Sequence, residues 1–245
     1  MKNYRLVLSY DGTRYKGWQR LKTTDNTIQG KAEAALERIL GAETELHSSG
    51  RTDAGVHARR QVCSFRTDSS LPASAILAQL RELLPEDIGA LELAEAAPRF
   101  HARYNCRERH YVYRVWCGDE PNVFERRYLY FFRAKPDLAA MRRAAEALTG
   151  EHDFAAFTSE KKGKRSTVRC IRSLEIQACG SELRFDIRAD GFLWNMVRII
   201  VGTLLEVGDG RRDADSVPAV LASGCRENAG FTVPARGLIL WDAEY

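Results

Sequence analysis

The chain contains the stretch Ser48-Ser49-Gly50-Arg51-Thr52-Asp53-Ala54-Gly55-Val56-His57-Ala58, in which one acid stands between two glycines. The carboxylate of Asp53 follows the guanidinium of Arg51 by two residues. Because glycine permits a positive φ, this composition predicts a sharp, rigid loop that presents a single acid. Nearby cations favour an ionised carboxylate and attract phosphates. The residue types alone nevertheless favour an ordinary surface turn, since Asp and Gly form turns for local reasons.

Length and composition bound the class of protein. The 245 residues are enough for one large domain or two small ones. Apolar residues make up 44% of the chain and charged residues 29%, which predicts a packed core and a soluble protein. The net charge is +4, from 37 Lys and Arg against 33 Asp and Glu. That excess is mild, so a nucleic-acid partner would require the positive charge to gather on one face.

The sequence shows no sign of export, membrane insertion or a bound cofactor. No basic, apolar leader follows Met1, and the longest apolar stretch, 196–207, is too short to span a bilayer. There is no dinucleotide glycine fingerprint and no P-loop. No two cysteines have C-x-x-C spacing, and scattered thiols fit a reduced protein. The six are Cys63, Cys106, Cys117, Cys170, Cys179 and Cys225. We therefore expect a cytoplasmic protein with no metal, no nucleotide cofactor and no membrane contact.

The first half of the chain reads as alternating strands and helices. Residues 4–10 alternate in polarity, which predicts a half-buried strand. Apolar residues at helical spacing follow from Ile28 to Leu40, with Asn26 as the expected cap and Gly41 as the end. A second helix is predicted over 72–84, and further strands before His47, over 61–66 and over 88–96. The resulting order, β-α-β-β-α-β, is typical of a ferredoxin-like unit.

The second half also mixes strands with helices. The predicted elements are a strand over 110–117, a helix from Asp137 to Gly150, paired strands over 168–177 and 183–189, a helix from Leu193 to Leu205, and a turn at 234–240 into a last strand. Arg198 lies at the margin of the apolar stripe of the 193–205 helix, where a surface arginine could also extend into solvent. The polar, basic segment 100–109 indicates a junction, so we predict domains 1–105 and 106–245.

Two loops have compositions that suit RNA. Residues 13–20 mix Tyr15 and Trp18 with Arg14, Lys16 and Gln19. Aromatic rings stack on bases while cations meet phosphates, although the composition fits a loop packed on the core at least as well. Residues 161–165 are mostly cationic, which is typical of a solvated loop and also compatible with an RNA clamp.

Several segments, taken together and in order, resemble the TruA family of tRNA pseudouridine synthases. The most specific is the string GRTDAGVHA at 50–58. The others are DG-x-x-Y-x-G-W-Q at 11–19, TIQ at 27–29, RERHYVYR at 107–114, HDF-x-x-F at 152–157, GFLWNMVRIIVG at 191–202 and PARGL at 234–238. Ile199 stands where the family usually has Asn, and the charged loop after Ser159 also departs from the pattern.

The resemblance implies a fold and a site. It implies an α+β protein with two ferredoxin-like halves, whose mainly antiparallel sheets join into one continuous sheet with the active-site cleft between them. Asp53 would be the catalytic residue, Arg198 would pair with its carboxylate, and the ring of Tyr111 would stack on the target base. Gly237 and Leu238 would line the uracil pocket.

The resemblance also implies a reaction. A homodimer would isomerise uridines 38, 39 and 40 in the anticodon arm of tRNA to pseudouridine, with no cofactor. Asp53 would act as a nucleophile or as a base, and the sequence leaves this choice open. Phosphate and RNA contacts are expected from the cationic and polar residues near the Asp53 loop and in the 13–20 loop. These are Arg51, Arg59, Arg60, Arg14, Lys16 and Gln19.

Three other interpretations of the sequence remain. The same catalytic residues could act on a uridine of another RNA, since loops set the substrate. The chain could be a non-catalytic RNA-binding or RNA-folding module on the same scaffold. An Asp/His hydrolase built on Asp53 and His57 would need an oxyanion or metal arrangement that the sequence does not suggest. The adjacent His152 and Asp153 are expected to be structural.

Overall fold

The computed structural model describes residues 1–160 and 166–245 and divides them into two compact units. The first unit comprises Met1–Arg107 with Ile239–Tyr245, and the second comprises Glu108–Leu238. The loop predicted at 161–165 lies outside the described residues. The division falls two residues after the predicted boundary, and it differs in placing the last strand with the first unit. The physical reason is that Ile239 and Leu240 pair with His57 and Ala58 of that unit.

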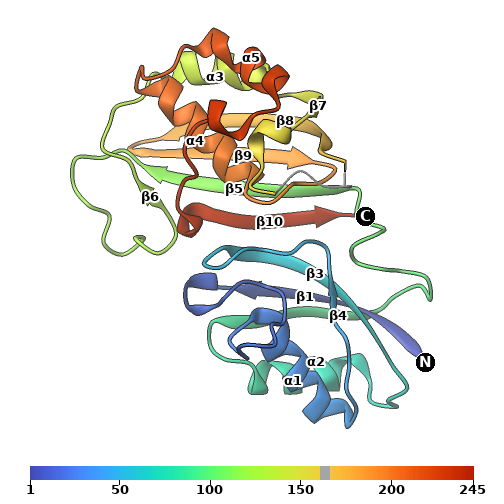
Figure 1. Ribbon diagram of the computed structural model, residues 1–245. Helices are drawn as coiled ribbons and strands as arrows, with labels where there is room; N and C mark the ends of the chain where they lie inside the picture. Colours follow the sequence, from blue (N-terminus) through green and yellow to red (C-terminus); the bar gives the residue numbers. More distant parts are fainter. Residues whose placement is uncertain (161–165) are drawn as a thin grey trace. The chain divides into compact units, whose positions relative to one another are not determined.

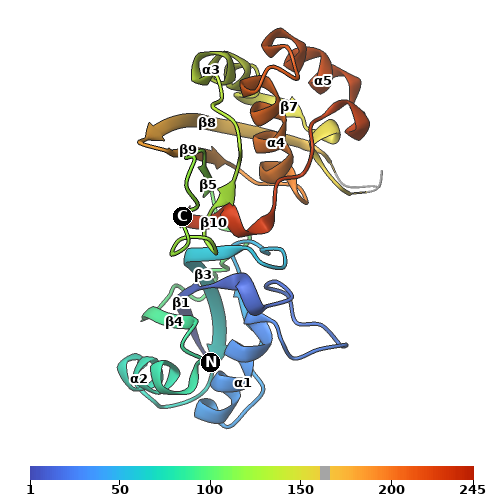
Figure 2. The same cartoon turned by 90° about the vertical axis from the view of Figure 1, so that its left-hand side faces the viewer.

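The sheet of the first unit has an antiparallel centre. Strand β1 (Lys2–Tyr10) lies between β4 (Ile88–Glu95) and β3 (His57–Thr67), antiparallel to both. The short β2 (His47–Ser48) pairs antiparallel with β3, and β10 (Leu238–Glu244) pairs parallel with it. Helices α1 (Ile28–Leu40) and α2 (Ala73–Leu83) contact each other beside this sheet, as both Figure 1 and Figure 2 show. The element order matches the predicted β-α-β-β-α-β.

Helix α1 illustrates where local sequence reasoning succeeds and where it errs. Its buried face is the predicted one, and Gly41 ends it. The predicted cap, Asn26, is wrong. Thr27 caps the helix by accepting a hydrogen bond from the amide of Gly30 at 3.2 Å. The Asn26 side chain instead donates to the carbonyl of Arg14 at 2.6 Å, so it ties the preceding loop to the helix start.

The second unit is built on a four-stranded antiparallel sheet. Strand β5 (Glu108–Trp116) pairs with β9 (Glu182–Ala189), β9 with β8 (Val168–Cys179), and β8 with β7 (Gly150–Asp153). The short β6 (Tyr130–Phe131) adds to β5 in parallel.

In the described part of the second unit, the helices are α3 (Leu138–Glu146), α4 (Met196–Gly208) and α5 (Val217–Ser223). Helix α3 contacts α4 and β8, and α4 contacts β5, so both helices cover the sheet of their own unit (Figure 1).

The second-unit helices begin and end differently from the prediction. Helix α3 is capped by Asp137 as predicted, but it ends at Glu146, and Gly150 begins β7. Helix α4 begins at Met196, and Leu193 is buried just ahead of it. Short 3-10 helices complete the connections: Gly12–Arg14, Ala155–Phe157, Ala214–Ser216, Arg226–Asn228 and Ala235–Gly237.

The mixed α+β class with mainly antiparallel sheets is confirmed in both units. The joining of the two sheets and the cleft between the halves stay predictions. In the ranges 1–160 and 166–245, no helix has the length and apolar character needed to cross a membrane.

Candidate functional site

The loop that carries Asp53 connects β2 to β3 and is held from one side by the 11–18 segment. The amide of Trp18 donates to the carbonyl of Thr52 at 2.9 Å. Gly17 has φ +96°, and a Cβ there would stand 2.9 Å from the Thr52 oxygen and 3.1 Å from the Ala54 nitrogen. Only glycine combines that φ with so close an approach of two backbones. The path of the loop is therefore fixed by a neighbouring segment.

Buried side chains also hold the loop. The Tyr10 hydroxyl lies 2.8 Å from the Thr52 hydroxyl oxygen. Gln61 Nε2 donates to the carbonyl of Gly50 at 2.7 Å, and Gln61 Oε1 accepts from the Ser49 hydroxyl at 2.6 Å. Buried hydrogen bonds are costly to break, because each broken bond leaves a polar group unsatisfied. The loop is thus held by a neighbouring backbone segment and by buried side chains.

Asp53 itself is half-buried between buried Thr52 and exposed Ala54. Its carbonyl accepts from the amide of Val56 at 3.1 Å, which closes the turn. The contacts that hold the loop use the backbone of residues 50, 52 and 53 and the hydroxyls of residues 49 and 52. A carboxylate on such a frame keeps its direction, which is what an attacking or proton-abstracting group requires.

His57 has a structural position at the start of β3. Its ring is buried, and Nδ1 accepts the Gly12 amide at 3.1 Å and lies 3.1 Å from Asp11 Oδ1. A ring nitrogen that accepts an amide proton is not available there as a general base. This placement argues against the Asp/His hydrolase interpretation.

The structure decides between the two interpretations of the 13–20 loop. Tyr15 and Trp18 are 5% and 2% exposed, so these two aromatic residues pack in the core. Arg14 is exposed, but its guanidinium donates to Asp87 at 2.7 and 2.9 Å, and this contact raises its pKa. Lys16 and Gln19 are exposed.

The other predicted cations of the first unit differ in their surroundings. Arg51 is exposed beside Asp53 in the sequence. Arg59 is exposed, with its guanidinium carbon 4.4 Å from the centroid of the Trp241 ring. Arg60, in contrast, pairs with Glu92 at 2.7 Å and lies 3.5 Å from Asp242. Its hydrogen bond to Glu92 lowers the pKa of that carboxyl. Arg60 therefore differs from Arg59 in being paired with carboxylates, and the expected phosphate contacts of both residues stay predictions.

Tyr111, Gly237 and Leu238 belong to the second unit. Tyr111 is 7% exposed in β5, and its ring contacts Phe192 edge-on with centroids 5.1 Å apart. A Cβ on Gly237 would stand 2.6 Å from Cζ of Tyr113, so the 235–237 turn packs directly on β5. The Tyr113 hydroxyl donates to the carbonyl of Pro234 at 2.7 Å. Leu238 follows, 6% exposed.

Arg198 is held in place on α4. Its Nε donates to the carbonyl of Val233 at 2.7 Å, and one terminal nitrogen donates to Asn195 Oδ1 at 2.6 Å. Asn195 adopts a left-handed conformation with φ 62°, and its amide donates to the Ser159 hydroxyl at 2.9 Å. These two acceptors fix the plane of the guanidinium. The alternative of an arginine that extends into solvent is therefore wrong.

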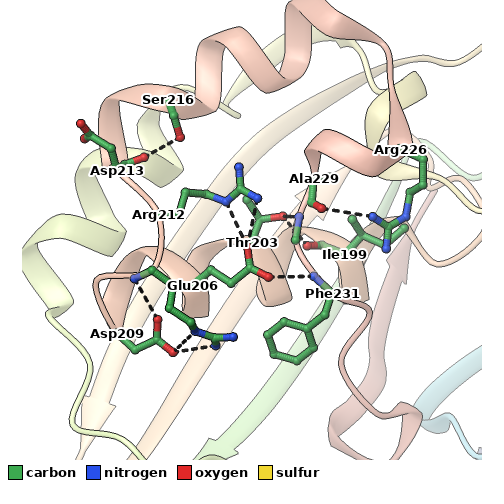
Figure 3. A network of polar contacts seen from close by, with 12 residues as sticks. Ile199, Thr203, Glu206, Asp209, Arg212, Asp213, Ser216, Arg226, Ala229 and Phe231 are labelled. Atoms are coloured by element: carbon green, nitrogen blue, oxygen red, sulfur yellow. Dashed lines mark hydrogen bonds and ion pairs between the residues drawn. The ribbon is translucent and has the colours of Figure 1, made fainter.

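A polar network on α4 holds the segment that meets Arg198 (Figure 3). Glu206 accepts two hydrogen bonds from Arg212, at 3.0 and 3.1 Å, and one from the amide of Phe231 at 3.1 Å. The Thr203 hydroxyl accepts the amide of Gly230 at 2.9 Å and donates to the carbonyl of Ile199 at 2.8 Å. The network anchors residues 230 and 231, two residues before the carbonyl that holds Arg198.

This network is the part of the candidate site that sequence reasoning missed. Thr203 and Glu206 are polar residues on an otherwise apolar helix, and that was the available signal. The segment 233–238 contacts both α4, through Val233, and β5, through Gly237. The 233–238 segment therefore links Arg198 to Gly237 and Leu238, and Tyr111 lies two residues before Tyr113 on the strand that Gly237 contacts. The pairing of Arg198 with Asp53 joins residues of different units and stays a prediction.

Metal chemistry finds no support in the described ranges. Among residues 1–160 and 166–245, no group of three or more His, Cys, Asp or Glu could hold a metal ion. Among the described residues, no disulfide bond joins Cys63, Cys117, Cys170, Cys179 or Cys225. The pKa of Cys63 is raised by burial, so this thiol is inert.

Comparison with known proteins agrees with the resemblance found in the sequence. A family model described as tRNA pseudouridine synthase matches residues 6–105 and 144–245. The tRNA pseudouridine synthase A of Clostridium kluyveri is 46% identical over 240 residues, 98% of this chain and 98% of that protein. The tRNA pseudouridine synthase A 2 of Bacillus cereus is 42% identical over 245 residues, 100% of both. A chain of a solved Cbf5-Nop10-Gar1 complex aligns with a TM-score of 0.36 and 15% identity, over 82% of this chain and 45% of that one. A structural similarity this weak supports no conclusion about function.

These matches first define a class of enzyme, the isomerases named pseudouridine synthases. Within that class, the chain belongs to the tRNA pseudouridine synthase family. The predicted membership of the TruA family is thereby confirmed.

Proposed function

We propose that this chain isomerises uridines 38, 39 and 40 in the anticodon stem-loop of tRNA to pseudouridine, as a homodimer. The observation that carries the proposal is the rigid Asp53 loop, in which the family's most specific string has a fixed backbone. Full-length relatives at 42% and 46% identity support the reaction and the tRNA substrate. The particular uridines, the anticodon arm and the dimer rest on the resemblance alone.

The reaction needs one carboxylate and a shaped pocket. The C–N glycosidic bond of the uridine breaks, the uracil turns, its C5 bonds to the sugar, the C5 proton leaves, and the former glycosidic nitrogen N1 takes up a proton. The product has the same atoms as the substrate, so no group donor and no oxidant is required. A stacked nucleotide cannot be reached, and flipping it out costs about a few kcal/mol.

Asp53 is the proposed catalytic residue. Its carboxylate acts in the ionised form, either as a nucleophile or as a base at the sugar. Arg198 pairs with this carboxylate and keeps it ionised and aimed. The hydrogen bonds of Arg198 to Val233 and Asn195 support this role, because they orient the guanidinium in advance. A planar guanidinium fork also matches a carboxylate better than an ammonium does.

The remaining proposed roles are divided between the second unit, which forms the uracil pocket, and the first unit, which contacts the RNA backbone. Tyr111 stacks on the flipped uracil, and Leu238, positioned by the close contact of Gly237 with Tyr113, forms an apolar wall of the pocket. Arg51 and Arg59 meet phosphates around the flipped nucleotide, and Lys16 and Gln19 extend the RNA-binding surface. The exposure of these four side chains supports the assignment. Arg14 contributes through its exposed side, in company with Asp87.

The test is tritium release from tRNA labelled at C5 of uridine, with sites mapped by carbodiimide primer extension. We expect release from uridines 38–40 with the wild-type chain. Asp53→Ala and Asp53→Asn should release none while binding tRNA with near-normal affinity. Near-normal turnover by either variant would refute the role of Asp53. Release from other uridines would refute the assigned positions and leave the chemistry standing.

A further inference from the structure

An exposed stack of three rings lies in the first unit, outside the catalytic residues. The rings of His47 and His101 are stacked, with centroids 4.7 Å apart and planes at 23°. The ring of Tyr104 lies 4.3 Å from His101 on a plane tilted by 33°. Tyr104 is 80% exposed, so most of its surface remains open to a ligand.

The turn that presents Tyr104 is anchored in the core. The amide of His101 donates to Asn105 Oδ1 at 2.7 Å, and the amide of Asn105 donates to the His101 carbonyl at 3.0 Å. Ala102 is fully buried; its amide donates to the Ser64 hydroxyl at 3.0 Å, and its carbonyl accepts from the Tyr245 hydroxyl at 2.7 Å. The aromatic ring is thus displayed by a fixed scaffold, and little conformational entropy would be lost on binding.

The imidazole beneath Tyr104 is held in its neutral form. Its Nδ1 accepts the amides of Arg103 at 3.1 Å and Tyr104 at 3.4 Å, which requires an unprotonated nitrogen. Burial, followed by the effect of His47, lowers the pKa of His101. The Tyr104 ring therefore rests on an uncharged imidazole, that of His101.

The charges of Arg103 and Arg66 act on the His101 ring of this stack, while at its other end His47 Nδ1 lies 3.6 Å from a carboxylate oxygen of Glu45. Residues 99–107 contain Arg99, Arg103 and Arg107 and no acid, and all three arginines are exposed. Arg66 is also exposed, and its charge acts on the His101 ring. Rings flanked by cations are the arrangement that binds unpaired nucleotides, with bases on the rings and phosphates at the cations. Clustered positive charge favours a nucleic acid over a protein of ordinary composition as the ligand, because a nucleic acid carries a regular array of phosphates.

We propose that Tyr104, stacked on His101 and His47, is a base-stacking subsite for an unpaired nucleotide of the tRNA substrate, with Arg103 and its neighbours at the adjacent phosphates. The inference rests on the proposed function only in taking tRNA as the ligand. An unpaired nucleotide is specified because bases within a duplex have both faces covered. His47 immediately precedes the stretch that carries Asp53, so the subsite belongs to the same unit as the catalytic acid.

The test compares Tyr104→Ala with Tyr104→Phe, which keeps the ring, in equilibrium binding of unmodified tRNA over a series of salt concentrations. We expect Tyr104→Ala to weaken binding about tenfold, in the range found when one stacked base is lost. Its slope of log affinity against log salt should stay unchanged, since no charge is removed. Tyr104→Phe should bind within about twofold of the wild type.

Two results would overturn the proposal. One is wild-type affinity in Tyr104→Ala. The other is a shift of oligomeric state in that variant, measured by sedimentation, with unchanged tRNA binding per protomer, because the ring would then be a protein contact. Equilibrium binding needs no turnover, so the subsite can stand if uridines 38–40 prove not to be modified. Conversely, product mapping of the wild type tests the proposed function whatever Tyr104 does.

Discussion

At the scale of single residues, the group that carries the catalytic charge and the groups that hold the loop backbone rigid are different residues. Asp53 supplies the acid, while Gly17, Tyr10 and Gln61 hold the backbone around it. The sequence identified the acid through its string of neighbours. It could not identify the groups that hold the loop, because they lie 36 residues before Asp53 (Gly17), 43 before it (Tyr10) and 8 after it (Gln61). The periodicity of apolar residues predicts which side chains are buried, but it does not predict which residues they contact.

Arg198→Lys tests the proposed pairing at this scale. A lysine keeps the charge but loses the fork that binds Val233 and Asn195 and that we propose also binds the Asp53 carboxylate. We expect kcat to fall at least tenfold, which is about 1.4 kcal/mol of transition-state stabilisation, while KM for tRNA changes little. Single-turnover kinetics on labelled tRNA would measure this. Equal losses in rate and in tRNA affinity would instead make Arg198 an RNA contact.

At the scale of elements, the sequence predicted most helices and strands, and its errors have local causes. The strand predicted to run up to His47 is instead β2, which begins at His47 and has only the two residues that pair with Ser64 and Cys63 of β3 before the Asp53 loop. Strand β3 begins at His57 because Ala58 pairs with Tyr10 and His57 pairs with Ile239 of β10. The loop aromatics Tyr15 and Trp18 proved to be core residues, which composition alone could not decide.

Glu206 on α4 provides the prediction at this scale. Its carboxylate connects Arg212 to the Phe231 amide, and this contact sets the segment whose Val233 carbonyl holds Arg198. Glu206→Ala should lower kcat about tenfold and reduce the free energy of unfolding by about 1–3 kcal/mol, since a buried amide loses its acceptor.

Glu206→Gln keeps an acceptor for the Phe231 amide and should recover most of the rate. The matched control is Asp209→Asn, which removes the charge that pairs with exposed Arg211 just beyond the end of the same helix and should change stability by less than about 1 kcal/mol. Steady-state kinetics and urea unfolding would check these variants. A Glu206→Ala enzyme with a normal rate would show that the network does not act on Arg198.

At the scale of the whole molecule, the chain ends in the unit where it began. Residues 239–245 belong to the first unit, and Ala243 is buried in one cluster with Val7, Val62 and Ala102. The sequence predicted the last strand and its turn. It did not predict this return, because no local pattern tells a strand which sheet it will join.

Ala243→Asp tests the return of the chain. A carboxylate placed among these apolar side chains should lower the free energy of unfolding by about 3 kcal/mol or more, whereas Ala243→Ser should cost about 1 kcal/mol. Hydrogen exchange read along the chain would locate the loss. We expect lost protection in β1 and β3, far from residue 243 in sequence. Loss confined to residues 108–238 would contradict the assignment of the C-terminal strand.

The fixed path of the Asp53 loop limits how this enzyme can change its substrate. Gly17 leaves no space for a side chain, and buried hydrogen bonds hold Gly50 and Thr52. Insertions or deletions in the loop would break these contacts, so a lineage acquiring a new RNA target has little freedom there. We expect evolutionary variation in substrate choice at exposed positions such as Lys16, Gln19 and Tyr104, where side chains can be exchanged without moving the acid. A laboratory library for new specificity should vary the same positions.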